Sequence, residues 1–198
     1  MRTLATVGLV VSATLLIAAA AEAANDDAPY AKLKAFLPPA TGAQACYART
    51  YDAQHLSQHP KQRVTEMVLF LRYITLSEEE ATLVATEDGG IEKEYFRYDF
   101  TLAAKVRDKR ETLHAAGSCN SAQTIGCGVD CDGGGIELEP VAGAPDKLLV
   151  RLERIRMTLG CGEDSDDIDL EGGEDDKVFR LDKIPVALCQ AMQEKLGG

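Results

Sequence analysis

The 198-residue chain has no tryptophan and three histidines, and it lacks the residue patterns on which common enzymes depend. No Gly-x-Ser-x-Gly elbow is present for a serine hydrolase, and no glycine-rich loop precedes a helix in the way that phosphate binding requires. Cys127 and Cys131 are not spaced as the Cys-x-x-Cys of thioredoxin-like proteins, and no histidine follows Cys131 for haem attachment. These absences favour a protein that is not an enzyme.

Long apolar runs are also scarce, and the one that exists lies at the N-terminus. Residues 4–20 are almost all apolar or small and follow Arg2. Ala21-Glu22-Ala23 then offers the small-x-small pattern after which signal peptidase cuts. A transmembrane anchor is the alternative, but no basic stop-transfer cluster follows. We therefore expect a signal peptide over residues 1–23, no membrane span after its cleavage, and a periplasmic or secreted protein.

All six cysteines follow this segment, and an even number in an exported chain predicts three disulfides. Counting back across the expected hairpin of residues 136–157 brings Cys161 close to Cys127 and Cys131. Cys161 is therefore expected to bond one of these two. A bond between the two outermost cysteines would then close the ends of the domain. The full set is Cys46, Cys119, Cys127, Cys131, Cys161 and Cys189.

The remaining length is that of one domain. Residues 24–45 contain three prolines and many alanines. This composition predicts a flexible N-terminal tether with one helical turn near residues 32–37. A single β domain is expected over residues 46–196.

Alternating apolar residues predict the strands of this domain. The clearest pattern, from Tyr95 to Arg107, is typical of a long half-buried antiparallel strand. Residues 62–75 are apolar on both faces, which predicts a strand that is covered on both sides. Leu148–Met157 changes phase at Glu153–Arg154, as a β-bulge does. Further strands are expected at residues 82–86, 112–117, 136–139, 168–171 and 178–182, and short helices at 49–59 and 185–196.

No long amphipathic helix separates these strands. The predicted fold class is therefore all-β: an antiparallel barrel or sandwich of about eight strands with short N- and C-terminal helical segments and a disulfide frame. The sequence leaves barrel and sandwich open.

Acidic residues dominate the chain and are unevenly placed. The formal net charge is −11, and residues 76–198 hold 27 acidic and 14 basic residues. Residues 161–176 alone hold nine acidic residues and no basic residue. This charge argues against nucleic acid and anionic membrane surfaces as partners and leaves a cation or a basic protein. Solubility alone also accounts for such a charge.

The stretch Gly117–Gly135 concentrates cysteines, glycines and two aspartates, and it suggests a calcium site. Asp130 and Asp132 flank a turn as the first ligands of a calcium loop do. The EF-hand pattern then fails, because Gly134 and Val141 occupy positions where oxygen ligands are expected. Glu137 or residues 163–176 could supply the missing oxygens. The alternative is that the aspartates are turn residues in a disulfide-pinned crossover between two hairpins.

His55 and His59 are a second metal candidate, because residues four apart on a helix can face one ion. No glutamate stands between them in the metalloprotease position, and His114 is distant in the sequence. Two surface histidines are the alternative.

The sequence thus predicts an exported β domain that acts by binding, with the acidic region as its expected surface. One alternative is a small-ligand carrier with a cavity in the barrel, and another is a calcium-stabilised module that uses Asp130 and Asp132. No catalytic residue is predicted, and calcium is the one cofactor considered.

Overall fold

The computed structural model describes residues 30–81, 95–107, 109–121, 123–130, 132–157 and 168–195. The expected signal peptide, the expected strand at 82–86 and the cysteines Cys131 and Cys161 lie outside these ranges. None of the described helices has the length and apolar character needed to cross a membrane. In chain order the elements are α1 (Ala31–Phe36), β1 (Gln44–Thr50), α2 (Ala53–Gln58), β2 (Val64–Thr75), β3 (Phe96–Val106), β4 (Leu113–Ser121), β5 (Ile125–Gly128), β6 (Gly134–Pro140), β7 (Lys147–Arg156), β8 (Asp169–Glu171), β9 (Val178–Ile184) and α4 (Val186–Lys195).

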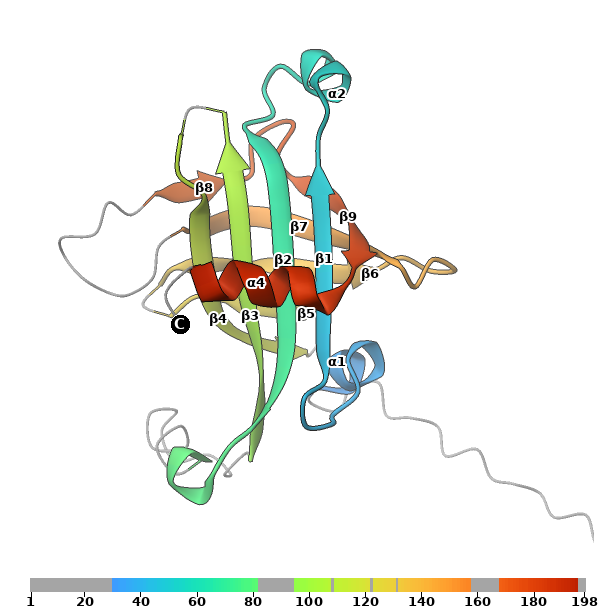
Figure 1. Ribbon diagram of the computed structural model, residues 1–198, viewed down its shortest axis with the longest axis vertical. Helices are drawn as coiled ribbons and strands as arrows, with labels where there is room; N and C mark the ends of the chain where they lie inside the picture. The colour runs from blue at the N-terminus through green and yellow to red at the C-terminus, as the bar shows by residue number, and fades with distance from the viewer. Residues whose placement is uncertain are drawn as a thin grey trace, which may run out of the picture.

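Eight strands close into an antiparallel barrel (Figure 1). Strands β1 to β7 pair in chain order, and β9 returns to lie between β7 and β1. The closing contact is short and joins Cys46–Ala48 to Asp182–Ile184. Strand β8 pairs with β7 and lies outside the barrel. The predicted all-β fold is confirmed, and its form is a barrel.

The barrel interior is filled by the side chains that alternate along the strands. Phe100, Leu102 and Ala104 of β3 are at most 1% exposed and belong to one large buried cluster, as their spacing predicted. Strand β7 also follows its prediction: Gly135 lies opposite Arg154 but Ile136 lies opposite Leu152, so the ladder skips Glu153 in a β-bulge. The phase slip in the sequence was the signature of this bulge.

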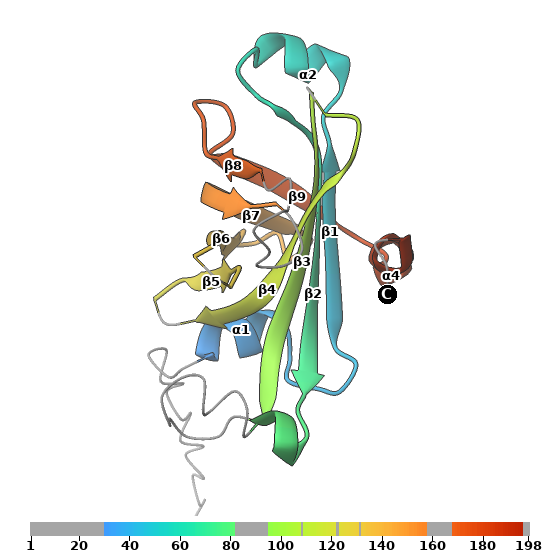
Figure 2. The ribbon, with the colours of Figure 1, turned by 90° about the vertical axis from the view of Figure 1, so that its left-hand side faces the viewer.

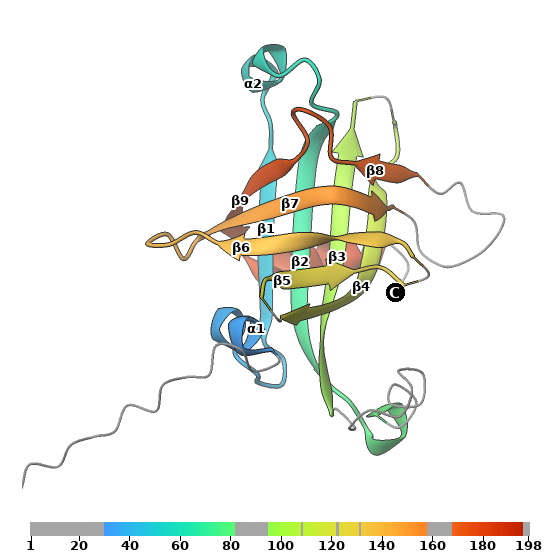
Figure 3. The same cartoon turned by 180° about the vertical axis from the view of Figure 1, so that it is seen from behind.

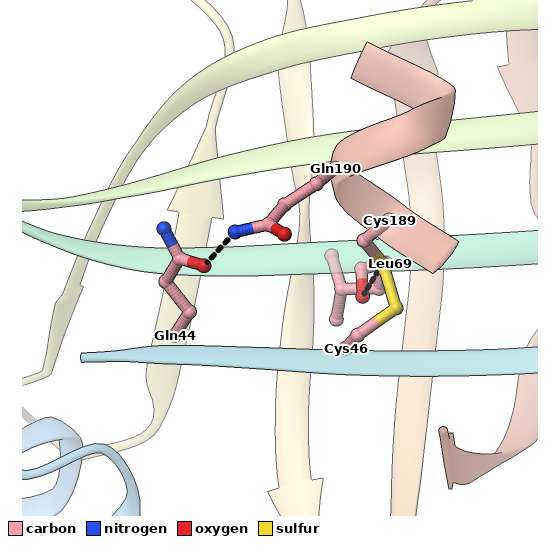
Figure 4. Close-up of a disulfide and its surroundings, with 5 residues drawn as sticks. All are labelled: Gln44, Cys46, Leu69, Cys189 and Gln190. Carbon is pink, nitrogen blue, oxygen red and sulfur yellow. Dashed lines mark hydrogen bonds between the residues drawn. A yellow bond between two sulfur atoms is a disulfide. The ribbon is translucent and has the colours of Figure 1, made fainter. Parts of the chain in front are cut away.

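The outer face of β2 is covered too, as predicted. Phe70 is 1% exposed and packs with Cys46 and Cys189 in a small separate cluster. Helix α4 lies across the outside of β1 and β2 (Figure 2), and the disulfide between Cys46 and Cys189 joins it to β1. Nearby, Gln190 Nε2 donates a hydrogen bond of 2.9 Å to Gln44 Oε1 (Figure 4). The predicted bond between the two outermost cysteines is confirmed.

The stretch Gly117–Gly135 is part of the sheet, which corrects the expected crossover between hairpins. It holds the end of β4, all of β5 and the start of β6. Cys119 and Cys127 lie opposite each other and form a disulfide with Cα atoms 4.0 Å apart. Cys127 is therefore not the partner of Cys161, and that alternative was wrong. A Cβ added at Gly135 would collide with the carbonyl oxygen of Cys127, so glycine permits the close approach of β5 and β6.

Residues 30–45 are folded, which corrects the expected tether over this part. The helical turn was correct, but α1 is anchored: Leu33 is 1% and Leu37 is 5% exposed, and both join the barrel core. The Tyr98 hydroxyl donates a hydrogen bond of 3.0 Å to the Leu37 carbonyl oxygen. The prolines that follow end the helix without preventing its docking, because two leucines four residues apart share one helix face.

Candidate functional site

A groove of about 740 Å³ opens at the end of the barrel where α1 lies. Its lining residues come from α1, from the β4–β5 connection and from the β6–β7 hairpin. Figure 3 shows α1 and the tip of this hairpin on the same side of the barrel. Small-molecule sites in proteins have this range of volume and combine an apolar lining with a few polar groups. The apolar residues that line it include Ala35, Phe36, Tyr47, Leu138, Pro140 and Pro145.

Three hydrogen bonds hold α1 against the β4–β5 connection. The Tyr30 backbone N–H donates to the Ser121 carbonyl oxygen at 3.1 Å, and the Leu33 N–H donates to Ser121 Oγ at 3.3 Å. Lys32 Nζ donates to the Gln123 carbonyl oxygen. Since Leu33 faces the core, the other side of this short helix is left to line the groove.

Tyr47 is the most buried polar side chain of this lining. The residue is 2% exposed, and its ring stacks on Phe36 with centroids 5.8 Å apart. Its hydroxyl has no hydrogen-bond partner in the part of the chain that the structure describes. Burial raises the pKa of the Tyr47 phenol, and the Asp146 carboxylate raises it further, so the group stays a neutral O–H donor. The hydroxyl oxygen is not one of the fully buried polar atoms, which among the described side chains without a partner are Arg72 Nε and His114 Nδ1, so it is open to the groove and a ligand acceptor can take the place of water there.

Charged side chains form the rim of the groove. Arg151 donates from Nε and Nη2 to Glu139 Oε2 at 3.0 and 2.7 Å, so these two charges compensate each other. Lys32 and Lys183 have no ion pair with any described carboxylate. Glu137 is the remaining acidic side chain of the lining. The lining therefore presents two ammonium groups without an ion pair against one carboxylate, and the Asp146 carboxylate that acts on Tyr47 is itself paired with Lys147 at 3.1 Å.

A second depression, of about 880 Å³, lies over β5, β6 and β7. Glycine backbone forms much of its lining, at Gly126, Gly128 and Gly135. Arg154 at its rim is already held by Asp169, with Nε and Oδ2 3.1 Å apart. Because glycine offers no side chain to contact an apolar ligand, the groove beside α1 is the better candidate site despite its smaller volume.

The proposed calcium ligands lie in the turn between β5 and β6. Asp130 and Asp132 are exposed, and Asp132 has a left-handed backbone with φ 57°. Arg154 Nη1 donates to the Asp132 carbonyl oxygen at 3.2 Å, which brings a positive charge to the turn. Among the described residues, no three His, Cys, Asp or Glu side chains are grouped to hold a metal ion. Calcium stays a prediction, which calorimetric titration of the wild type and of Asp130→Asn with calcium chloride would test.

The described part of the acidic region, residues 168–176, is largely engaged within the chain. Asp169 pairs with Arg154, and Glu174 pairs with Lys61 at 2.5 Å. Asp176 is 1% exposed and accepts two backbone N–H groups from residues 63 and 64, at 2.6 and 3.3 Å. These contacts use carboxylates that a cation or basic protein would need. Binding of such a partner here stays a prediction.

His55 lies on α2 and His59 is the residue that caps its C-terminus, at the other end of the barrel from α1 (Figure 1), and their ring centroids are 4.3 Å apart. The expected helix is confirmed, although β1 takes its first two residues and α2 spans Ala53–Gln58. His55 Nε2 lies 2.9 Å from Gln62 Oε1, and His59 Nδ1 lies 3.8 Å from Asp175 Oδ1. Each imidazole thus has its own protein partner, and this described region holds no three-ligand metal group.

Comparison of the chain with protein-family models, with curated proteins and with solved structures finds no match. The function must therefore be argued from the site itself. Of the residues singled out in the sequence, Asp130, Asp132, His55 and His59 do not line the groove, whereas Glu137, considered there as a calcium ligand, does. The other sequence signal toward the groove was the helical turn near residues 32–37.

Proposed function

We propose that this protein is an exported carrier or binding protein that takes a small, largely apolar ligand in the groove beside α1. The observation that carries the proposal is the groove, whose 740 Å³ suits a small molecule. Its lining joins apolar side chains to an unpartnered phenol donor. The two disulfides support export, because such bonds persist in oxidising compartments.

The ligand is proposed at the end of the barrel rather than along its axis. Large side chains fill the middle of the barrel, among them Phe100, Leu102 and Leu148, each at most 1% exposed. An apolar ligand there would have to displace a packed core, which costs several kcal/mol. In the groove beside α1, apolar side chains are already open to a ligand, so no core side chain has to move.

The test uses N-phenylnaphthylamine, a neutral dye whose fluorescence rises in apolar sites. We expect saturable binding to the wild type and binding weakened at least about tenfold by Ala35→Glu. This change places a longer, charged side chain in the apolar lining, where burial of a charge is costly. Ala187→Glu is the matched control, since Ala187 is also an exposed helical alanine but lies on α4.

Two results would count against the proposal. One is a wild type that does not bind the dye, and the other is an Ala35→Glu variant that binds as well as the wild type and Ala187→Glu. Circular dichroism melts of both variants would first establish that they are folded.

A further inference from the structure

We infer that the ligand of this groove carries an anionic group, such as a carboxylate, which accepts a hydrogen bond from the Tyr47 hydroxyl and lies near Lys32 and Lys183. The inference rests on the proposed function and names the chemical class of its ligand: an amphipathic acid, with an apolar body and one negative head.

The Tyr47 hydroxyl is the first reason. It belongs to a side chain that is more than nine-tenths buried, it lines the groove, and no described residue accepts its proton. Its ring is fixed by the stack on Phe36, so the hydroxyl keeps one position. An O–H donor that is held in one position and opens onto the groove favours a ligand with an acceptor at that point, and a charged acceptor makes the stronger bond.

The two lysines are the second, independent reason. The chain has a formal net charge of −11, and most of its described lysines and arginines at strand surfaces are paired with carboxylates. Lys32 and Lys183 lack such a partner among the described residues although both line the groove. They come from α1 and β9, which are far apart in the sequence. Because both line one groove, their charges favour a negative head group there.

The remaining lining fits the apolar part of such a ligand. Phe36, Leu138 and Pro140 carry no charge and lie on the same groove. A molecule that places its head at Tyr47 can therefore cover apolar surface with the rest of its length. A fatty acid and an aromatic acid share this chemistry, and competition between representatives of each distinguishes them.

The experiment compares two ligands that differ in the head group alone. Dodecanoate and dodecanol compete with N-phenylnaphthylamine for the wild type, Tyr47→Phe, Lys183→Gln and the control Lys177→Gln, whose lysine lies outside the groove. We expect dodecanoate to displace the dye better than dodecanol. The ratio of the apparent Kd of dodecanol to that of dodecanoate should fall about tenfold in Tyr47→Phe and about two- to fivefold in Lys183→Gln. Lys177→Gln should have the same ratio as the wild type.

Tyr47→Phe preserves the ring and its stack, so unchanged binding of the neutral dye to this variant shows an intact groove. Equal displacement by the acid and the alcohol would overturn the inference and leave the proposed function standing. The same holds if Tyr47→Phe and Lys183→Gln retain the full advantage of the acid. If the dye and both competitors fail to bind the wild type, the proposed function itself fails.

Discussion

Loss of the Cys46–Cys189 disulfide should destabilise the protein about twice as much as loss of the Cys119–Cys127 disulfide. The first bond joins residues 143 apart in the sequence, and the second joins residues 8 apart. In the chain-entropy treatment the stabilisation grows with the logarithm of the loop length, which gives about 5 kcal/mol for the longer loop and about 2.5 kcal/mol for the shorter. At about 2–4 °C per kcal/mol in a domain of this size, the alanine double variants should melt about 10–20 °C and about 5–10 °C lower.

The longer bond also has a local role, because it fixes α4. The buried cluster between this helix and the barrel comprises Cys46, Phe70 and Cys189, so two of its three members belong to the disulfide. Without the bond, little buried apolar surface holds the helix. We expect amide hydrogen exchange over residues 186–195 to accelerate in Cys46→Ala/Cys189→Ala, while β3 keeps its protection.

Circular dichroism melting without reductant, followed by hydrogen exchange with mass spectrometry, measures both effects. The Cys119→Ala/Cys127→Ala double variant is the matched control, since it also removes two buried sulfur atoms. Similar melting temperatures for the two double variants would refute the loop-length reasoning. An α4 that remains protected without its disulfide would refute the local part.

Three further predictions concern stability and covalent structure. Burial raises the pKa of Asp176 above its ordinary value of 3.8, so the folded chain holds this proton more tightly than the unfolded chain does. The free energy of unfolding of the wild type relative to Asp176→Asn should therefore fall as the pH rises through the interval just above 3.8. Urea titrations over a pH series measure this dependence, and a slope of the opposite sign would contradict the prediction. Gly135→Ala should cost about 1–3 kcal/mol in urea denaturation, because its Cβ meets the Cys127 carbonyl oxygen, whereas Gly173→Ala, with no neighbour within 4 Å, should stay within about 0.5 kcal/mol. Cys131 and Cys161 are the two cysteines left by the observed bonds, so unreduced protein treated with iodoacetamide should gain no mass, and two added groups would show that they are free.

The parts of the fold that sequence reasoning predicted are those where side-chain size and polarity alternate strongly. In β3 every second residue from Phe96 to Val106 is apolar, and all of these except Phe96 are buried. The bulge at Glu153 could also be predicted, because one extra residue shifts the apolar alternation of β7 by one position. Leu170 likewise identified β8, since it is the buried residue between two exposed acids.

Two strands were missed because their residues give weak contrast. Two of the four residues of β5 are glycines, so its outward positions show no polar side chain. Strand β1 alternates Ala45 and Tyr47 with Cys46 and Ala48, and small residues or cysteine fit either face. Their positions become clear from the pairing with neighbouring strands, which is information from distant parts of the chain.

The groove could not be predicted either, because its position also depends on contacts between distant parts of the chain. Lys32, Tyr47, Leu138 and Lys183 come from four separate elements, and no local spacing relates them. The sequence instead drew attention to residues that cluster along the chain, such as Asp130 and Asp132. Closure of the barrel and docking of α1 are what bring the groove residues together, and both depend on tertiary packing.

The chain is acidic overall, but much of this acidity lies outside the groove, whose lining holds Glu137 and Glu139 as its carboxylates. Glu174 and Asp175 contact the α2 region through Lys61 and His59. Helix α1, which contributes to the groove lining, lies at the opposite end of the molecule from α2 (Figure 3). Tyr47 pairs with Leu69, which lies five residues along β2 from Val64, where Asp176 accepts a backbone hydrogen bond; this is about 17 Å of extended strand. The separation is about twice the screening length of about 8 Å at physiological salt, so repulsion from the acidic end is weakened at Tyr47. At the groove itself Glu139 is paired with Arg151 and the nearby Asp146 with Lys147, so an acid head group would meet Lys32 and Lys183 against the one carboxylate without an ion pair, Glu137.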